Sequence, residues 1–230
     1  ITPKNLERFL ETLGVQNQLV TNTNQLIIVK TNQWRSIKGE CFLFEKQDDE
    51  FKFIRSFKIV LGRNGLKWGE GLHSVTDSNI KQEGDGAAPA GVFLLGNAFG
   101  NLDVTLAGNW PYIKTSQADL FIDDSKSIHY NRWVVQDTVK KDWDSHEVML
   151  RPDGLYNRGL VIQHNMNPTK PGFGSAIFFH IWKNKHKGTA GCTAADKTDV
   201  LSLLNWIKKD AQPLLIQLPE DYFETVLNDL

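Results

Sequence analysis

Residues 175–195 read SAIFFHIWKNKHKGTAGCTAA, and they predict a buried strand followed by a polar, lysine-rich loop. The stretch 175–182 is a largely apolar run that contains His180, as is typical of a strand buried on both faces. A second run of this kind, residues 159–164, precedes it, and a proline-containing loop separates the two. We therefore expect the two runs to be neighbouring strands of a central sheet.

Further strand signals lie on both sides of this pair. The segments Glu40–Lys46 and Phe51–Val60 flank a polar turn and predict a hairpin, and Gln25–Lys30 and Pro213–Leu218 predict two more strands. Period-2 spacing in the second arm of the hairpin places four apolar side chains on one face, namely Phe51, Phe53, Phe57 and Ile59.

Three segments have helical spacing. Residues 2–13 predict a helix that Thr2 caps, and residues 219–230 predict a short C-terminal helix. Asp196 is positioned to cap a third helix, which carries its own apolar stripe. Together with the strands, these helices predict a mainly β (α+β) fold with peripheral helices, organised as a single domain over residues 1–230.

Composition narrows the classes of protein to which the chain can belong. A chain of 230 residues with 40% apolar side chains can bury a hydrophobic core large enough to be stable without disulfide bonds. The formal net charge of -1 gives no support to a polyanion partner such as nucleic acid. No run of about 18 apolar residues indicates a membrane span. Because the chain begins at Ile1 without a signal pattern, we interpret it as a processed or shortened form.

A glycine-rich region runs from residue 62 to 108 and contains the loop Glu83–Phe93. This loop lacks the strand–loop–helix order and the Gly-Lys-Ser/Thr ending of a phosphate cradle, so we interpret it as a structural loop that borders the active cleft. Asp123 and Asp124 are adjacent and would point to opposite faces of a strand, which favours a turn or cap role over a pair of catalytic carboxylates.

The candidate chemistry is that of a cysteine nucleophile with a histidine base. Cys192 follows Gly191 and closes the loop that begins after His180, so the two side chains can face each other. A thiol becomes a strong nucleophile only as a thiolate, and an imidazole can take its proton. Gly191 removes side-chain bulk, which would let backbone N–H groups around Gly191 and Cys192 face an oxyanion. The other cysteine, Cys41, reads as a small buried hydrophobe.

Zinc is the competing interpretation of the same residues. His180, His186 and Cys192, with His164 as a possible addition, are residue types that bind zinc. Their spacing matches no common zinc pattern, and lysines surround His186, so we expect no metal and no cofactor. His186 then reads as a solvated loop residue. The remaining histidines, His73, His129 and His146, read as surface or turn residues.

The same stretch resembles the signature of the L,D-transpeptidase (YkuD-type) catalytic domain. That family places a histidine on a strand, then a loop, then Ser/Thr-x-Gly-Cys, which here are His180 and Thr189–Cys192. Three further stretches are similar to one branch of the family: Gly84-Asp85-Gly86 with Pro89–Phe93, Asp123-Asp124 followed by Tyr130-Asn131, and Gly174–Phe178. The likeness covers roughly residues 60–210.

The resemblance implies a β-sandwich-like fold and peptidoglycan as substrate. Cys192 would attack the L-centre carbonyl of a diaminopimelate residue in a tetrapeptide stem and release D-alanine. His180 would act as general base and acid, Gly191 would belong to the oxyanion turn, and Thr189 would hold that turn through a hydrogen bond near the histidine. The thioester would pass to an amine of another stem, forming a crosslink, or to a protein lysine.

Two alternatives stay open at this point. Water as the acceptor would make the protein an L,D-carboxypeptidase. A domain that keeps the fold but has no catalytic activity would be an inert peptidoglycan-binding module. The resemblance also implies carbapenem-type inhibitors, a periplasmic or cell-envelope location, and a role in cell wall biogenesis and cell shape.

The residues that grip the substrate follow the family pattern less closely. Ala190 and Ala194 stand where the familiar motif has polar side chains. The candidate substrate-binding residues are Trp182, Ala190, Asp85 and Arg132. Lys183, Lys185 and Lys187 are further candidates for binding the substrate carboxylate, alongside Arg132.

Overall fold

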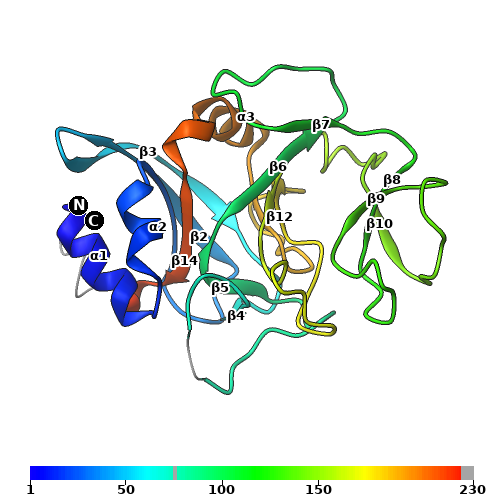
Figure 1. Ribbon diagram of the computed structural model, residues 1–230, viewed down its shortest axis with the longest axis horizontal. Coiled ribbons are helices and arrows are strands. Elements are labelled where there is room, and N and C mark those ends of the chain that lie inside the picture. Colours follow the sequence, from blue (N-terminus) through cyan, green and yellow to red (C-terminus); the bar gives the residue numbers. More distant parts are fainter. Residues whose placement is uncertain (75–76, 224–230) are drawn as a thin grey trace.

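The computed structural model describes residues 1–74 and 77–223, and one large sheet dominates it (Figure 1). In chain order the elements are α1 (Pro3–Thr12), α2 (Asn17–Asn22), β1 (Gln25–Thr31), β2 (Lys38–Gln47), β3 (Glu50–Val60), β4 (Leu66–Trp68), β5 (Ala88–Phe93), β6 (Leu95–Gly100), β7 (Tyr112–Lys114), β8 (Asp119–Ile122), β9 (Trp133–Val135), β10 (His146–Val148), β11 (Arg158–Ile162), β12 (Phe178–Ile181), β13 (Thr193–Ala195), α3 (Lys197–Trp206), the 3-10 turn η1 (Lys209–Ala211), β14 (Leu214–Pro219) and the 3-10 turn η2 (Glu220–Tyr222).

The large sheet is mixed and has the order β4-β5-β14-β1-β2-β3-β13-β12-β11-β6-β7. The predicted hairpin is present as the antiparallel pair β2–β3, and the two predicted central strands are the antiparallel neighbours β11 and β12. The short strand β13 pairs with β3 on one side and runs parallel to β12 on the other. Because β13 carries the residues that follow Cys192, the candidate nucleophile lies where the two halves of the sheet join.

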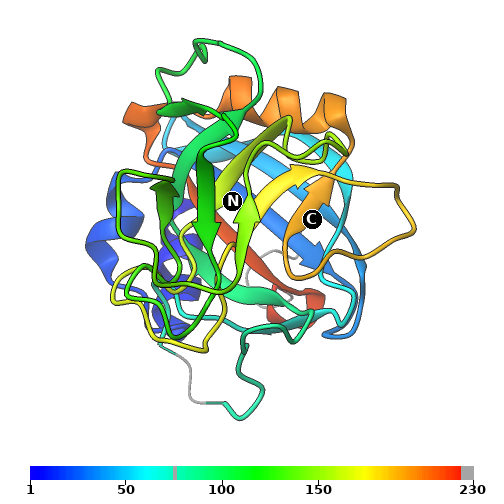
Figure 2. The ribbon, with the colours of Figure 1, turned by 90° about the vertical axis from the view of Figure 1, so that its right-hand side faces the viewer.

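The sheet encloses a core between its own two halves. One buried cluster contains Leu26 and Ile28 of β1 together with Leu160 of β11 and Phe179 of β12, which are far apart in the strand order. Figure 2 accordingly shows the strands of one half crossing in front of those of the other. This arrangement confirms the predicted mainly β, sandwich-like fold class.

A smaller sheet, with the order β10-β8-β9, lies to one side of the large one (Figure 1). Aromatic side chains join the two sheets. The Phe121 ring of β8 lies 5.1 Å from that of Phe178, and the Trp133 ring of β9 lies 5.7 Å from that of Phe99, as ring centroids. Edge-on ring pairs of this kind bury large apolar areas in a defined geometry, so the small sheet is held firmly over β12.

The helices are peripheral, as their sequences predict. The Thr2 hydroxyl accepts from Asn5 N at 3.2 Å to cap α1, and the Asp196 carboxylate accepts from Thr198 N at 3.0 Å to cap α3. Helix α3 packs against β11, β12 and β13, so it supports the strands of the candidate site from behind. No helix in the described part of the chain has the length and apolar character that crossing a bilayer requires.

The predicted C-terminal helix falls mostly outside the described residues. Strand β14 ends at Pro219 and the 3-10 turn η2 follows it at Glu220–Tyr222. Residues 224–230 of the predicted helix lie beyond the described range.

The predicted apolar face of β3 is wrong at Phe53. The pairing of β2 with β3 shifts between Leu43, which faces Arg55, and Phe44, which faces Phe53, so β3 carries one extra residue. Such a bulge moves the preceding side chains to the other face of the strand. Phe53 packs its ring against Phe44 and is 56% exposed, whereas Phe51 and Phe57 stay buried.

His73 is buried, contrary to its prediction as a surface or turn residue. Its ring packs between Trp68 and Phe93, and its Nδ1 accepts a hydrogen bond from Val92 N at 3.1 Å. A Cβ at Gly91 would lie 1.9 Å from the ring, so only glycine fits beside it. Burial lowers the pKa of His73, which keeps the ring neutral inside the fold.

Candidate active site

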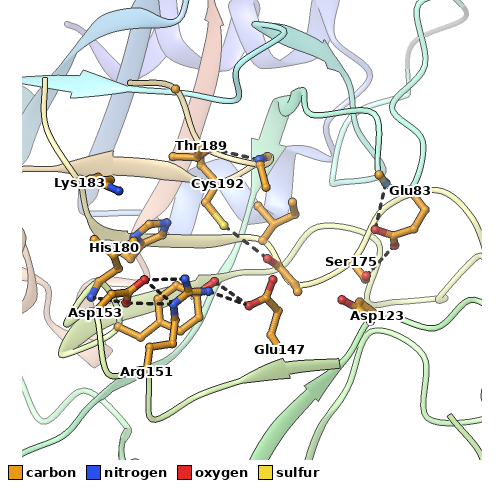
Figure 3. A pocket seen from close by; sticks show the side chains of 18 of the residues that line it. Glu83, Asp123, Glu147, Arg151, Asp153, Ser175, His180, Lys183, Thr189 and Cys192 are labelled. Atoms are coloured by element: carbon orange, nitrogen blue, oxygen red, sulfur yellow. Dashed lines mark hydrogen bonds and ion pairs between the residues drawn. The ribbon is translucent and has the colours of Figure 1, made fainter. Parts of the chain in front are cut away.

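A cleft of about 440 Å³ lies beside β12 and the loop that leads to β13 (Figure 3). The loop at residues 81–84, Asp123, and the segment 147–156 supply part of its lining. Residues 175–177 and the region between His180 and Cys192 supply the rest. The cleft is therefore assembled from segments that lie far apart in the sequence.

Strand register places the two candidate catalytic side chains on the same face of the sheet. In the parallel pair β12–β13, Phe179 is opposite Thr193, and side chains alternate along each strand. His180 and Cys192, each adjacent to one of these residues, therefore both point to the opposite face. Packing agrees, because Phe179 belongs to the main core, whereas Phe178 and Cys192 belong to the cluster beneath the small sheet.

The Cys192 thiol is enclosed and protonated in the resting site. The residue is 7% exposed, its Sγ accepts from Phe178 N at 3.3 Å, and the thiol donates to Ala176 O at 3.4 Å. Burial raises the pKa of the thiol to about 12, because a thiolate is poorly solvated there. A nucleophilic thiolate thus requires a proton acceptor close by.

His180 is the candidate acceptor, and it lines the same cleft as Cys192. Its Nδ1 lies 2.8 Å from Ile181 O, and since a carbonyl oxygen only accepts, the proton sits on Nδ1 and Nε2 keeps its lone pair. Burial lowers the pKa of His180 to about 4, so the ring is neutral at rest. The carboxylate of Asp153 opposes that shift and would stabilise the imidazolium formed when His180 takes a proton.

Thr189 holds the turn that carries the cysteine. Its hydroxyl donates to Cys192 O at 2.6 Å and accepts from Gly191 N at 3.1 Å, so both bonds lie within the turn and neither reaches the histidine. A Cβ at Gly191 would lie 3.1 Å from Ala87 O, which explains the glycine by close packing. Since the Gly191 N–H is already used, the Cys192 N–H is the amide of this turn that can be proposed as an oxyanion donor.

One wall of the cleft carries an ion-pair cluster around Arg151. Its Nη2 lies 2.6 Å from Asp153 Oδ2 and its Nη1 lies 3.2 Å from Glu147 Oε2. The guanidinium also lies over the Tyr156 ring, 4.9 Å from its centroid. The Tyr156 ring in turn packs on His180 at 5.1 Å, so this cluster fixes the position of the histidine ring.

The opposite wall carries carboxylates (Figure 3). Glu83 Oε2 accepts from Tyr130 OH at 2.5 Å and from Ser175 Oγ at 2.6 Å. Asp123 also lines the cleft, and its Oδ1 is buried without a hydrogen-bond partner among the residues described. An unpaired buried carboxylate oxygen is costly, which makes Asp123 suited to a cationic or hydrogen-bond-donating group of a ligand.

The predicted substrate-binding residues are only partly brought together. Ala190 lines the cleft, whereas Trp182 lines an adjoining hollow that shares Asp153, Leu155 and Lys183 with the cleft. Arg132 is exposed and is not among the residues that line the cleft. Asp85 does not line it either and instead binds Lys81, which does.

The lysines of the loop after β12 are also only partly at the cleft. Lys183 and Lys187 line the cleft, while Lys185 does not. His186 is exposed, with its Nδ1 3.4 Å from Lys38 Nζ, as expected for a solvated loop residue.

Several lining residues had no distinguishing signal in the sequence. They are Lys81, Glu147, Arg151, Asp153 and Tyr156. Two other lining residues did carry a signal: Glu83 begins the loop that the sequence placed at the border of the cleft, and Asp123 lies in one of the stretches that resemble the family. Asp124 has the predicted cap role, because it accepts from Lys126 N and Asp144 N.

The histidine considered as an additional zinc ligand has other partners. His164 Nδ1 accepts from Glu70 N at 3.2 Å, and Nε2 donates to Phe173 O at 3.0 Å. Both ring nitrogens are therefore used in joining two loops. Within residues 1–74 and 77–223, no group of three or more histidine, cysteine or acidic side chains is arranged to hold a metal ion.

Comparison with known proteins gives one family match. The model of the family described as L,D-transpeptidase catalytic domain (YkuD) matches residues 28–216. A search of curated proteins found no match. A solved structure of Bd1075 from Bdellovibrio bacteriovorus is similar over 86% of this chain and 49% of that chain, with 11% identity and a TM-score of 0.41. The chain thus spans about half the length of that protein.

Proposed function

Because the chain belongs to the L,D-transpeptidase catalytic domain family, whose members act on peptidoglycan, we propose that it is a cysteine acyltransferase of tetrapeptide stems. Cys192 is the proposed nucleophile and His180 the proposed general base and acid. The observation that carries the proposal is the shared orientation of these two side chains on β12 and before β13, at one cleft.

Acylation would begin with proton transfer from the Cys192 thiol to Nε2 of His180. The sulfur then attacks the carbonyl carbon of the L-centre of the diaminopimelate residue, and the carbonyl oxygen becomes an oxyanion near the Cys192 N–H. Collapse of this intermediate breaks the bond to the terminal D-alanine. The imidazolium gives its proton to the departing amine, leaving a thioester on Cys192 and free D-alanine.

The second half of the reaction returns the enzyme to its resting state. An amine of another stem, or of a protein lysine, attacks the thioester and loses a proton to His180, which forms an amide and restores the thiol. Water in place of the amine would give a tripeptide and an L,D-carboxypeptidase. The same residues serve both outcomes, so the acceptor decides between them.

Both cationic and anionic side chains line the cleft, which supports a substrate that carries carboxylates as well as an amine. Arg151 and Lys183 lie on the histidine side of Cys192, and Glu83 and Asp123 lie on the other side (Figure 3). A stem peptide that ends in diaminopimelate and D-alanine carries both carboxylates and an amine. Cations near His180 would compensate for the alanines at positions 190 and 194 in binding a substrate carboxylate.

The site of action follows from the substrate class. The family acts on the cell wall, which lies outside the cytoplasm. We propose the periplasm or cell envelope as the location, with a role in wall biogenesis and thereby in cell shape.

Acylation by a carbapenem tests the nucleophile directly. Intact-protein mass spectrometry should detect a covalent adduct on the wild-type protein and on Cys41→Ala, and none on Cys192→Ala. Cys41 is the matched control because it is a thiol that is 0% exposed and lies away from the cleft. An adduct of equal yield on Cys192→Ala would overturn the assignment.

Incubation with a tetrapeptide-stem muropeptide tests the reaction. Crosslinked dimers would support transpeptidation, and tripeptides with free D-alanine would support the carboxypeptidase alternative. Unchanged muropeptide from a protein that also fails to react with a carbapenem would contradict the proposed activity and leave a binding module.

A further inference from the structure

A buried lysine lies beside the turn that carries Cys192. Lys81 is 3% exposed, and its side chain passes Gly174, where a Cβ would lie 2.8 Å from Lys81 Cε. Its ammonium ends at the nucleophile turn, since a Cβ at Gly191 would lie 3.6 Å from Lys81 Nζ. Lys81 and Cys192 also line the same cleft. A positive charge is thus fixed one residue away from the nucleophile.

Asp85 holds this ammonium in place. Its Oδ1 lies 3.0 Å from Lys81 Nζ, and its carboxylate also accepts the backbone N–H groups of Gln82 and Ala87, each at 2.9 Å. Lys81 Nζ additionally donates to Gln82 O at 3.4 Å. A lysine ammonium has three N–H donors, so these two contacts leave one for a further acceptor.

The local charge balance makes Lys81 differ from the other cation near the thiol. Asp85 faces two lysines, because Lys67 Nζ lies 3.4 Å from its Oδ2, and one carboxylate against two ammonium groups leaves an excess positive charge. Arg151, by contrast, faces both Asp153 and Glu147. Of the two cations that favour the thiolate, Lys81 is therefore the one held by a single carboxylate, although Glu83 and Asp123 line the same side of the cleft.

The other ionisable groups around the thiol do not supply the positive charge that Lys81 brings to the Cys192 turn. Glu147 opposes the thiolate, whereas Lys81 and Arg151 favour it. Tyr156 packs on His180, and His180 is neutral at rest. With the Gly191 N–H taken by Thr189, the turn also has fewer backbone donors for an oxyanion.

We propose that the Lys81 ammonium stabilises the negative charge that forms at Cys192, first on the thiolate and then on the oxyanion of the tetrahedral intermediate, with Asp85 as its positioning residue. The oxyanion part rests on the function proposed above, whereas the thiolate part concerns the free protein. This assigns a role to Asp85, which the sequence connected with the substrate, through Lys81 rather than through contact with substrate.

The test is the pH dependence of Cys192 alkylation by iodoacetamide, which is uncharged, followed by mass spectrometry of the modified peptide. In this reaction the thiolate displaces iodide and forms a thioether. Lys81→Met should shift the rate profile to higher pH and lower the rate near pH 8 about tenfold, equivalent to one pKa unit of the thiol. The matched control is Lys140→Met, which removes an exposed lysine that does not line the cleft and should stay within about twofold of wild type.

Two outcomes would overturn the proposal. One is an unshifted profile in Lys81→Met. The other is a rate lowered by the same factor with iodoacetamide and with the anionic iodoacetate, because loss of a nearby positive charge should slow the anionic reagent more, whereas altered access to the thiol slows both reagents alike. If Lys81→Met does not fold, Lys81→Gln, which keeps an N–H donor for Asp85 and loses the charge, gives the same comparison. A shifted profile in a protein without activity on muropeptides would retain the thiolate role and refute only the proposed function.

Discussion

Thr189 shows how one hydroxyl shapes the nucleophile turn. It accepts the Gly191 N–H and donates to the Cys192 carbonyl, so it closes the turn from both sides. The Cys192 side chain then points toward the cleft face that it shares with His180. The geometry of the nucleophile thus depends on a side chain that has no chemical role of its own.

Replacing Thr189 therefore has a predictable cost. Thr189→Ala removes both hydrogen bonds and should lower the free energy of unfolding by about 1–3 kcal/mol. The same substitution should also lower the rate of carbapenem acylation. Thr189→Ser retains the hydroxyl and should keep most of both quantities. Urea unfolding and the acylation rate measure the two effects, and equal behaviour of the two variants would show that the hydroxyl does not hold the turn.

At the scale of elements, the site depends on three strands that meet. β12 contributes His180, β13 follows Cys192, and β3 joins them to the other half of the sheet. Helix α3 starts directly after β13 and packs behind these strands. The start of α3 consequently fixes where β13 ends.

The cap of α3 is the local interaction to test. The Asp196 carboxylate accepts from Thr198 N at 3.0 Å and from Thr198 Oγ1 at 2.8 Å. Asp196→Ala should cost about 1 kcal/mol of unfolding free energy, while Asp196→Asn should cost much less, because asparagine caps nearly as well. Thermal unfolding of the two variants provides the measurement, and a loss as large in Asp196→Asn would contradict the capping role.

At the scale of the whole molecule, the fold encloses histidines that are neutral. Burial lowers the pKa of His164 to about 3 and that of His180 to about 4, and it also lowers the pKa of His73. As the pH falls below about 6.5, the unfolded chain binds protons at these histidines before the folded chain does. Their stabilisation is therefore complete above that pH and is lost as the pH falls toward 4.

Urea unfolding between pH 7 and pH 4.5 tests this pH dependence. Each such histidine should contribute a slope of up to about 1.4 kcal/mol per pH unit. His164→Gln should reduce the slope by about that amount, whatever its effect on stability at pH 7. His186→Gln, a change in the exposed loop, should leave the slope unchanged. A slope unaffected by His164→Gln would mean that this histidine is not a source of the acid sensitivity.

The sequence by itself determined the strands and the nucleophile turn. The apolar runs that became β11 and β12, the hairpin β2–β3, and the caps Thr2 and Asp196 depend on local spacing, which the chain carries in a few neighbouring residues. That His180 and Cys192 line one cleft was predictable for the same reason, because a short loop joins the two. Local periodicity also has a limit, as the bulge that exposes Phe53 illustrates.

Only the tertiary structure decided which charges surround the thiol. Lys81 and Arg151 come from separate loops, and nothing in their immediate sequence distinguishes them from solvated residues. Their positions follow from how the small sheet and the glycine-rich loop pack over β12. Loop paths, and hence contacts between distant side chains, depend on the packing of the whole chain. For that reason the candidate nucleophile could be located from sequence, while the charged groups around it could not.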